Sequence, residues 1–253
     1  MAPPRPVVTI ATTLRHFPHE GVGGAAAFKL LPDHFRKPIE ELAAQPNLPW
    51  DLQMMLKVGG SVARERCRMA TEFLALSRND DDILLMVDFD LMPTGQDYAD
   101  LLGRMQTLEV CGGLYTTREA QGDWVMSRFP NPPSPSGLLN AVEIGTGFKA
   151  FKPTAFRKVL RKNPWLDCEG TDAGHRLFGF FSMGPVEDVT LWPGRRRWLT
   201  EDYWFDWLCR DAGVLIVADT RIKLRHLDIE SGNIYPAQFP PEPGELPPET
   251  KEL

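Results

Sequence analysis

Residues 82–93 read DILLMVDFDLMP, an apolar run that leads directly into two aspartates. Ile83–Val87 is continuously apolar, which is typical of a strand buried on both faces of a parallel sheet. Side chains alternate along an extended chain, so Asp88 and Asp90 are expected to point the same way. Sheets in α/β proteins bind their ligands where parallel strands end. The segment therefore predicts a buried strand that brings two carboxylates to a ligand site.

These two aspartates are candidate ligands for a divalent cation. Carboxylates held this close repel each other, and a cation would neutralise both. Oxygen ligands suit Mg²⁺ or Mn²⁺. The alternative is a solvated turn with two acidic residues. The buried strand before Asp88 strengthens the case for a metal site, and both interpretations stay open.

Strands and helices are expected to alternate around this segment. Helices are predicted at Val62–Leu76, Thr94–Leu108, Pro153–Leu160 and Thr200–Ala212, with a shorter piece near Ile39–Ala44. Strands are predicted at Val7–Thr12, Ile83–Val87, Val110–Thr116, Val142–Phe151, Val214–Ala218 and Ile222–His226. This order predicts an α/β fold with a mixed, mostly parallel sheet flanked by helices.

The chain is expected to form one domain over residues 1–230, followed by a proline- and glutamate-rich tail at 231–253. Its 253 residues are 43% hydrophobic and 25% charged, which is ordinary for a globular protein. The tail is too polar and too rich in proline to build a core. Two other proline-rich segments, 31–52 and 128–140, are interpreted as irregular.

Charge and cysteine content narrow the function classes. A general nucleic-acid binder usually has a basic excess, and the net charge of −6 argues against one. The four cysteines form no CxxC pair, so no zinc or redox motif is predicted. Cys67 and Cys209 fall in helical patterns and are expected to be small core residues. Without a secretory signal or a bilayer-spanning apolar stretch, a soluble cytoplasmic protein is expected.

Three further segments contain residues that suit a site. Glu201 and Asp202 open a predicted helix, where the dipole favours carboxylates. His226 ends a predicted strand, and Gly145 and Gly147 allow close backbone approach to a ligand. Each has a purely structural alternative, respectively a helix start, a satisfied histidine and a β-bulge.

Basic and aromatic residues near the predicted helix at Thr200–Ala212 are also candidates. Arg195–Arg197 is interpreted either as a solvated loop or as a clamp for phosphates or an anionic acceptor. The tryptophans that can stack on a sugar or a base, or pack in the core, are Trp124, Trp192, Trp198 and Trp204.

Six segments in this order resemble the family 2-like glycosyltransferases of the GT-A fold, over about residues 7–227. The segments are VVTIATTLR (7–15), SVARERCRMATEFL (61–74), ILLMVDFDLMP (83–93), CGGLYTTRE (111–119), VEIGTGFKAFKPTAFRKV (142–159) and LTEDYWFDWLCRDAGVLIVADTRIKLRHL (199–227). In this order they are similar to six features of the family: the nucleotide-binding strand, the helix that begins with AR, the strand with the DxD motif, the GGLY strand, the GTGF segment, and the ED helix with the histidine that follows it. Six segments in the same order are more specific than any one of them.

The resemblance implies a role for the acidic residues and the histidine. Asp88 would contact ribose or metal, Asp90 would be the principal metal ligand, and His226 would complete the metal site with the donor diphosphate. Asp202 would be the general base on the acceptor hydroxyl of an inverting enzyme, and Glu201 would position acceptor or donor. The ED motif occurs in both inverting and retaining relatives, so the stereochemistry stays open.

The resemblance also implies contacts to the donor. Thr12 and Arg64 would contact its base and ribose, and Gly145 and Gly147 would line the sugar pocket. The implied enzyme is a metal-dependent glycosyltransferase that uses Mn²⁺ or Mg²⁺ and a nucleotide-sugar, most simply a UDP- or GDP-sugar. The acceptor hydroxyl stays open among a saccharide, a lipid-linked sugar, a protein and a hydroxymethylated base in phage DNA. A bacterial or phage-infected cell is the expected setting.

Two other functions fit the same sheet. A sugar-phosphate nucleotidyltransferase shares the acidic metal site, but it needs a Gly-rich phosphate loop directly after the first strand. The residues there, ATTLR at 11–15, do not supply one. A non-catalytic nucleotide- or sugar-binding protein is expected to lack Asp90 or Asp202, and both are present.

Overall fold

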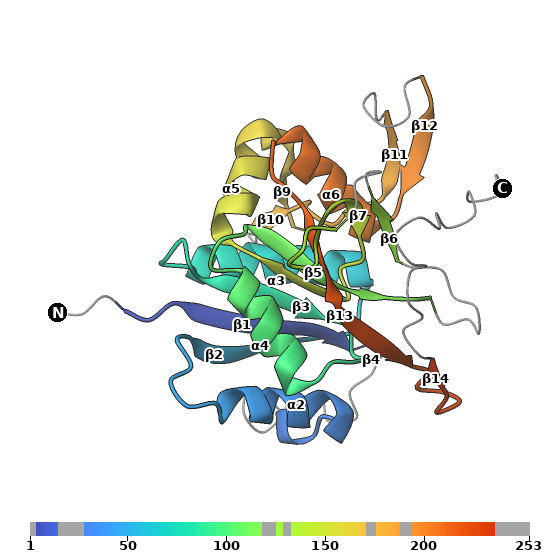
Figure 1. The fold of residues 1–253 in the computed structure, drawn as a ribbon. Coiled ribbons are helices and arrows are strands. Elements are labelled where there is room, and N and C mark those ends of the chain that lie inside the picture. The colour runs from blue at the N-terminus through green and yellow to red at the C-terminus, as the bar shows by residue number, and fades with distance from the viewer. Residues whose placement is uncertain are drawn as a thin grey trace.

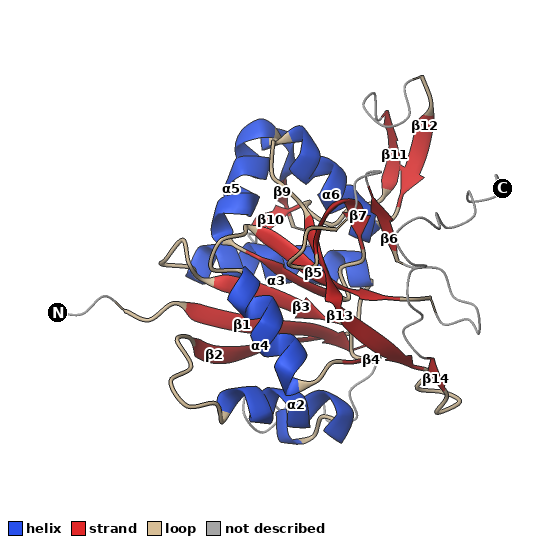
Figure 2. Ribbon diagram, in the orientation of Figure 1, coloured by secondary structure: helices blue, strands red, loops and turns tan. Residues whose placement is uncertain are grey.

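The computed structural model describes residues 4–14, 28–117, 125–128, 133–170, 176–187 and 194–235. Over these ranges the chain folds into a large mixed sheet with helices on both faces (Figure 1, Figure 2). The predicted fold class, an α/β protein with a mixed sheet flanked by helices, is confirmed.

The helices and strands have the following bounds. The helices are α2 (Asp33–Ala43), α3 (Val62–Leu76), α4 (Gly95–Arg104), α5 (Pro153–Lys162), the short 3₁₀ helix η1 (Pro164–Leu166) and α6 (Glu201–Asp211). The large sheet contains β1 (Val7–Leu14), β2 (Asp51–Val58), β3 (Ile83–Val87), β4 (Leu91–Met92), β5 (Val110–Tyr115), β6 (Met126–Arg128), β7 (Leu138–Ile144), β8 (Phe148–Phe151), β13 (Val217–Leu227) and β14 (Ile234–Tyr235). Two small sheets pair β9 (Asp167–Glu169) with β10 (Arg176–Phe178) and β11 (Gly184–Glu187) with β12 (Arg196–Leu199).

Strand direction places several strand ends at one edge of the large sheet. Its main path runs in the order β2-β1-β3-β8-β5-β13-β7-β6. β1 is parallel to β2 and β3, and β5 is parallel to β13. β8 lies antiparallel between β3 and β5, so these two strands run the same way. The carboxyl ends of β1, β2, β3, β5 and β13 therefore meet at one edge.

Side chains of the central strands point alternately to the two faces of the sheet, and each face packs into its own hydrophobic core. In β3, Leu84 and Met86 pack on one face with α3, α5 and α6, while Ile83, Leu85 and Val87 pack on the other with α2 and α4. All five side chains are at most 1% exposed. This explains why the strand is apolar without a break, since both of its faces are covered.

An aromatic cluster fills the core under α5 and α6. The Phe205 ring lies 5.1 to 5.9 Å from the rings of Phe151, Phe156, Phe180 and Phe181. Cys67 and Cys209 are buried in the same core, as expected, and both are free thiols.

The proline-rich segment 31–52 is more regular than predicted, and the short helix expected near Ile39–Ala44 is the second half of a longer one. The segment contains α2 and the first residues of β2, a strand absent from the predicted elements. Phe35, Ile39 and Leu42 form a buried stripe at helical spacing, which offsets the cost of Pro38 inside the helix. In the other irregular segment, residues 138–140 belong to β7.

Two predicted strand boundaries are also wrong. The single strand expected at Val142–Phe151 is two strands, β7 and β8, because the chain turns at 145–147. The two strands expected at Val214–Ala218 and Ile222–His226 are one long strand, β13, with an irregularity between Asp219 and Lys223. Pairing of β14 with β13 carries the sheet to Tyr235, and the rest of the predicted tail lies outside the described residues.

In the part of the chain that the structure describes, no helix is both long enough and apolar enough to cross a membrane.

We expect Phe205→Ala to lower the free energy of unfolding by about 3–5 kcal/mol, because it opens a cavity inside the aromatic cluster. Urea unfolding followed by circular dichroism measures the change. Leu215→Ala is the control, since Leu215 is 54% exposed. A change below about 1 kcal/mol for Phe205→Ala would contradict a close-packed cluster.

Candidate functional site

The two aspartates after β3 lie in a turn. Leu91 N donates to Asp88 O at 3.1 Å, and Phe89 and Asp90 have turn conformation. The prediction that Asp88 and Asp90 point the same way is therefore wrong, since it assumed an extended chain. The Asp88 carboxylate contacts Arg66, whereas that of Asp90 faces His226.

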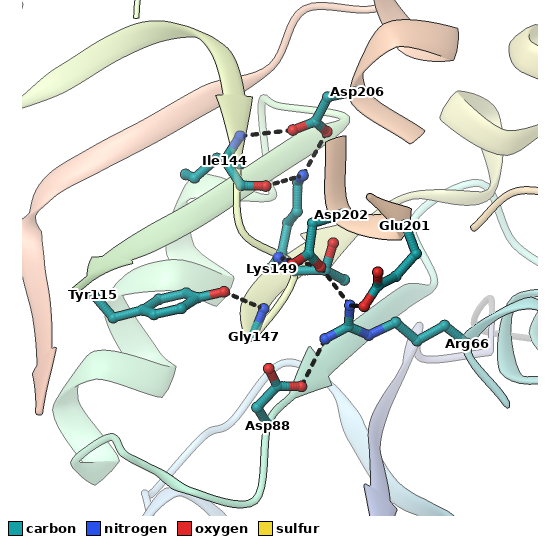
Figure 3. A network of polar contacts seen from close by, with 10 residues as sticks. Arg66, Asp88, Tyr115, Ile144, Gly147, Lys149, Glu201, Asp202 and Asp206 are labelled. Atoms are coloured by element: carbon teal, nitrogen blue, oxygen red, sulfur yellow. Dashed lines mark hydrogen bonds and ion pairs between the residues drawn. The ribbon is translucent and has the colours of Figure 1, made fainter. Parts of the chain in front are cut away.

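Arg66 of α3 joins Asp88 to the acidic start of α6 (Figure 3). Its Nη2 donates to Asp88 Oδ1 at 2.8 Å. Its Nη1 donates to Asp202 Oδ1 and lies 3.4 Å from Glu201 Oε1. The Arg66 side chain is only 3% exposed. One buried cation thus holds three carboxylates from two distant parts of the chain.

This environment moves the pKa values of the two α6 acids in opposite directions. Burial alone would raise the pKa of Asp202, but Arg66, Lys149 and Thr146 outweigh it and the pKa is lowered. Asp202 is therefore ionised at neutral pH. Burial and then the neighbouring Asp202 raise the pKa of Glu201, although Arg66 opposes them. The adjacent acids are thus electrostatically distinct.

The turn between β7 and β8 packs closely against this cluster. Thr146 N donates to Asp202 Oδ1 at 3.1 Å, and Gly147 N donates to the Tyr115 hydroxyl at 2.9 Å. A Cβ at Gly145 would lie 2.0 Å from that hydroxyl, and one at Gly147 would lie 2.8 Å from Asp88 Oδ2. Both positions therefore need glycine because side chains of the site approach the backbone.

A buried ion pair fastens the same turn to α6 (Figure 3). Lys149 Nζ donates to Asp206 Oδ1 at 2.5 Å and to Ile144 O at 2.8 Å. Asp206 also accepts from Ile144 N at 2.7 Å. Burial raises the pKa of Asp206 to about 6, against the opposing effect of Lys149. The pair fixes the glycine turn relative to Asp202, one helical turn earlier on α6.

Asp90 and His226 form a second pair at the same edge of the sheet. β4 pairs with β13, so that Leu91 lies opposite His226. His226 Nδ1 lies 2.8 Å from Thr116 O, and a carbonyl only accepts, so Nδ1 carries the proton. Nε2 then faces Asp90 Oδ2 at 3.4 Å. Histidines that bind metals commonly have one ring nitrogen held in this way.

The metal site expected from Asp88, Asp90 and His226 is only partly assembled. Among the described residues, no group of three His, Cys, Asp or Glu side chains is arranged to hold a metal ion. Asp88 is engaged by Arg66, whereas Asp90 and His226 face each other. The donor chemistry therefore fits a cation held by Asp90 and His226, and the role of Asp88 as a further ligand stays a prediction.

The two predicted nucleotide contacts, Thr12 and Arg64, lie on β1 and α3. Thr12, in β1, is 1% exposed, and no hydrogen-bond partner reaches its Oγ1 within the described ranges. β1 pairs with β3 up to Ala11 and Met86, so Thr12 lies near the level where β3 ends. Arg64 lies in the first turn of α3, two residues before Arg66 and on another side of the helix. Whether either contacts a nucleotide stays a prediction.

The alternatives left open for Arg195–Arg197 and for the four tryptophans are resolved only in part. Arg197 lies in β12 and pairs with the fully buried Glu143 at 2.9 Å, so it is not a solvated loop residue. Trp204 packs against the core and near Trp207, whereas Trp198 is 69% exposed. Trp124 and Trp192 lie outside the described residues.

Arg66, Tyr115, Lys149 and Asp206 are site residues that sequence reasoning missed. Of the two arginines, the sequence analysis chose Arg64 and not Arg66. A helix turns by about 200° over two residues, so the two side chains lie on different sides of α3 and contact different neighbours. Asp206 follows Asp202 by four residues, a spacing that places both on one helix face. Tyr115 and Lys149 lie in segments that carry the family resemblance. They were not recognised as site residues because their contacts depend on how β5 packs against β8.

Comparison with known proteins yields distant structural similarities. No protein-family model and no curated protein matches the chain. One similar solved structure is that of A197 from STIV, which is 14% identical with a TM-score of 0.45 over 92% of this chain and 94% of that one. Another is 4-diphosphocytidyl-2C-methyl-D-erythritol synthase from Anaerococcus prevotii, 11% identical with a TM-score of 0.32 over 66% of this chain and 79% of that one.

We expect Arg66→Gln to lower the free energy of unfolding by about 3 kcal/mol or more, because three carboxylates lose their buried cation. Burial would then raise the pKa values of Glu201 and Asp202 above the unfolded values, so the cost appears as the pH rises through them. The difference from wild type should therefore be larger near pH 8 than near pH 4. Urea unfolding at both pH values measures it.

Arg36→Gln is the matched control for this variant. Arg36 also joins two carboxylates, those of Asp33 and Glu40, but on the surface of α2. Its loss should leave the unfolding free energy nearly unchanged. Equal effects of the two substitutions would contradict the central role of Arg66.

Proposed function

We propose that the protein is a metal-dependent glycosyltransferase that moves a sugar from a nucleotide-sugar to an acceptor hydroxyl. One observation carries the proposal. Asp88 of the DxD pattern and Glu201 and Asp202 of the ED pattern, which resemble the two acidic motifs of GT-A glycosyltransferases, come together around Arg66 at the carboxyl edge of the sheet. Ligands of α/β proteins bind at this edge.

The charge balance of the site supports metal dependence. Asp88, Glu201 and Asp202 face one guanidinium, and Asp90 lies at the same edge with His226. Lys149 and Asp206 compensate each other and add no net charge. A nucleotide diphosphate would meet a surplus of negative charge here, so its binding requires an additional cation.

Asp90 and His226 would hold that cation, and the ion when bound would neutralise the leaving diphosphate. His226 is oriented for this role by its hydrogen bond to Thr116 O. Asp88 would orient the donor ribose, with its carboxylate held by Arg66. The backbone at Gly145–Gly147 would lie against the transferred sugar.

The acceptor would approach the start of α6. Asp202 is ionised at neutral pH and can accept the proton of an acceptor hydroxyl if the enzyme inverts. Glu201, whose pKa is raised, would hydrogen-bond the acceptor or donor. The acceptor classes named from the sequence, among them a hydroxylated base in nucleic acid, all supply such a hydroxyl.

We expect a UDP- or GDP-type nucleotide diphosphate to raise the thermal midpoint of the protein with Mn²⁺ but not with EDTA. A ligand at a hundred times its Kd adds about 2.7 kcal/mol to the unfolding free energy. Asp90→Asn should lose the metal-dependent shift, whereas Asp100→Asn, an exposed control on α4, should keep it. An unchanged shift in Asp90→Asn would refute the assignment of Asp90.

We expect Asp202→Asn to bind the donor normally and to transfer sugar about 10²–10⁴-fold more slowly, the usual contribution of a general base. Glu201→Gln should reduce the transfer rate less than Asp202→Asn does. The two variants are a matched pair, because each removes one carboxylate beside Arg66. Donor turnover with release of nucleoside diphosphate measures the rate. Wild-type transfer by Asp202→Asn would exclude it as the base, and release of pyrophosphate from a nucleoside triphosphate would instead identify a nucleotidyltransferase.

A further inference from the structure

A basic groove of about 1000 Å³ runs along the outer face of α3, beside α5 and β10. The described residues of its lining include the cations Lys57, Arg64, Arg68, Arg157 and Arg176 and the acid Glu72. In the described part of the lining cations thus outnumber acids, in a chain with a net charge of −6, although acids beside the groove pair with several of these cations. Among the contacts described above, none of these residues joins the network around Arg66.

The geometry of α3 separates the groove from the acidic site. Arg64, Arg68, Thr71 and Ala75 recur at helical spacing and all line the groove. Arg66 lies about 200° around the helix from Arg64 and joins the carboxylates instead. One helix thus contributes to an acidic site and to a separate basic groove.

The ion pairs of the groove are of the kind that a ligand can replace. Lys57 pairs with Glu72, Arg157 with Asp80, and Arg176 with Asp167. Arg68 also lies 3.4 Å from Glu65, one helical turn earlier on α3. The Arg157 and Arg176 side chains are 44% and 66% exposed, and such surface pairs contribute little to stability. A phosphate offers more acceptor oxygens and more charge than a carboxylate, so it competes well for guanidinium groups.

The floor of the groove is apolar. Leu74, Leu160, Leu177 and Phe178 line it and pack against the core beneath. The Arg176 guanidinium lies 4.9 Å from the centre of the Phe178 ring. A cationic rim above an apolar and aromatic floor suits an anion that has an apolar or aromatic body.

We propose that this groove binds a phosphate ester with an aromatic or apolar body, of which a nucleotide, free or within a single strand, is the simplest. The site does not require the proposed transferase activity or its metal, and it assigns Arg64 to this groove instead of to the sugar donor. Its affinity comes from the rim cations together with the apolar floor, and the cationic part weakens as salt rises. The floor contributes contact with the body of the ligand.

The test is fluorescence anisotropy of a labelled oligothymidylate of about ten nucleotides, a length within the range of single-strand sites. EDTA and the absence of nucleotide-sugar keep the acidic site out of the measurement. Arg64→Gln/Arg68→Gln should weaken binding about tenfold or more, and should reduce the salt slope by about 1.4 for two lost phosphate contacts. Arg36→Gln/Lys37→Gln on α2 removes the same charge elsewhere and should bind like wild type.

Competition identifies the source of the phosphate ester. Displacement by thymidine monophosphate indicates a free nucleotide, whereas displacement by unlabelled oligothymidylate alone indicates a strand. Inorganic tripolyphosphate should compete poorly, because it lacks a body for the floor. The proposal is overturned if wild type does not bind the probe at low salt, if tripolyphosphate competes equally well, or if both double variants bind alike.

Discussion

The ion-pair network of Arg66 is the interaction on which the candidate site depends. Asp88 directly follows β3, and Asp202 lies in the first turn of α6, more than a hundred residues later. Without a cation between them, burial and mutual repulsion would oppose the approach of these two carboxylates. Arg66 makes their approach favourable because its planar guanidinium donates to several acceptors at once. Burial of Arg66 is tolerated because its positive charge is paired with carboxylates.

Around this network, the backbone is held from two sides. The Lys149 and Asp206 pair fastens the turn at 145–147 to α6, and the Tyr115 hydroxyl accepts from Gly147 N. The glycines in this turn bring it against Tyr115 and Asp88. The Tyr115 ring also contacts His226 edge to face at 5.8 Å, which links the Arg66 network to the Asp90 pair. The site is therefore built from β3, β5, the β7–β8 turn, α3, α6 and β13 together.

The strongest sequence signals were those that a single element carries. The apolar run at Ile83–Val87 and the helix at Val62–Leu76 lie where the sequence predicts them, because burial on both faces and an N-cap at Ser61 are local properties. Only the end of α2, near Ile39–Ala44, was predicted, because the prolines concealed the rest of the helix. Packing on the sheet outweighs the cost of Pro38. The turn after β3 was also missed, because the apolar run gave no sign of where the extended chain stops.

By itself, the sequence determined the mixed α/β class and the acidic residues at the strand end and the helix start. Those features follow from periodicity and from the place of each residue in its own element. Only the tertiary structure decided which charges meet. It paired Asp88 with Arg66 and Asp90 with His226, and it turned Arg64 toward a groove on another face of α3. Such pairings depend on the register of strands and on how helices lie across the sheet, which no local pattern encodes.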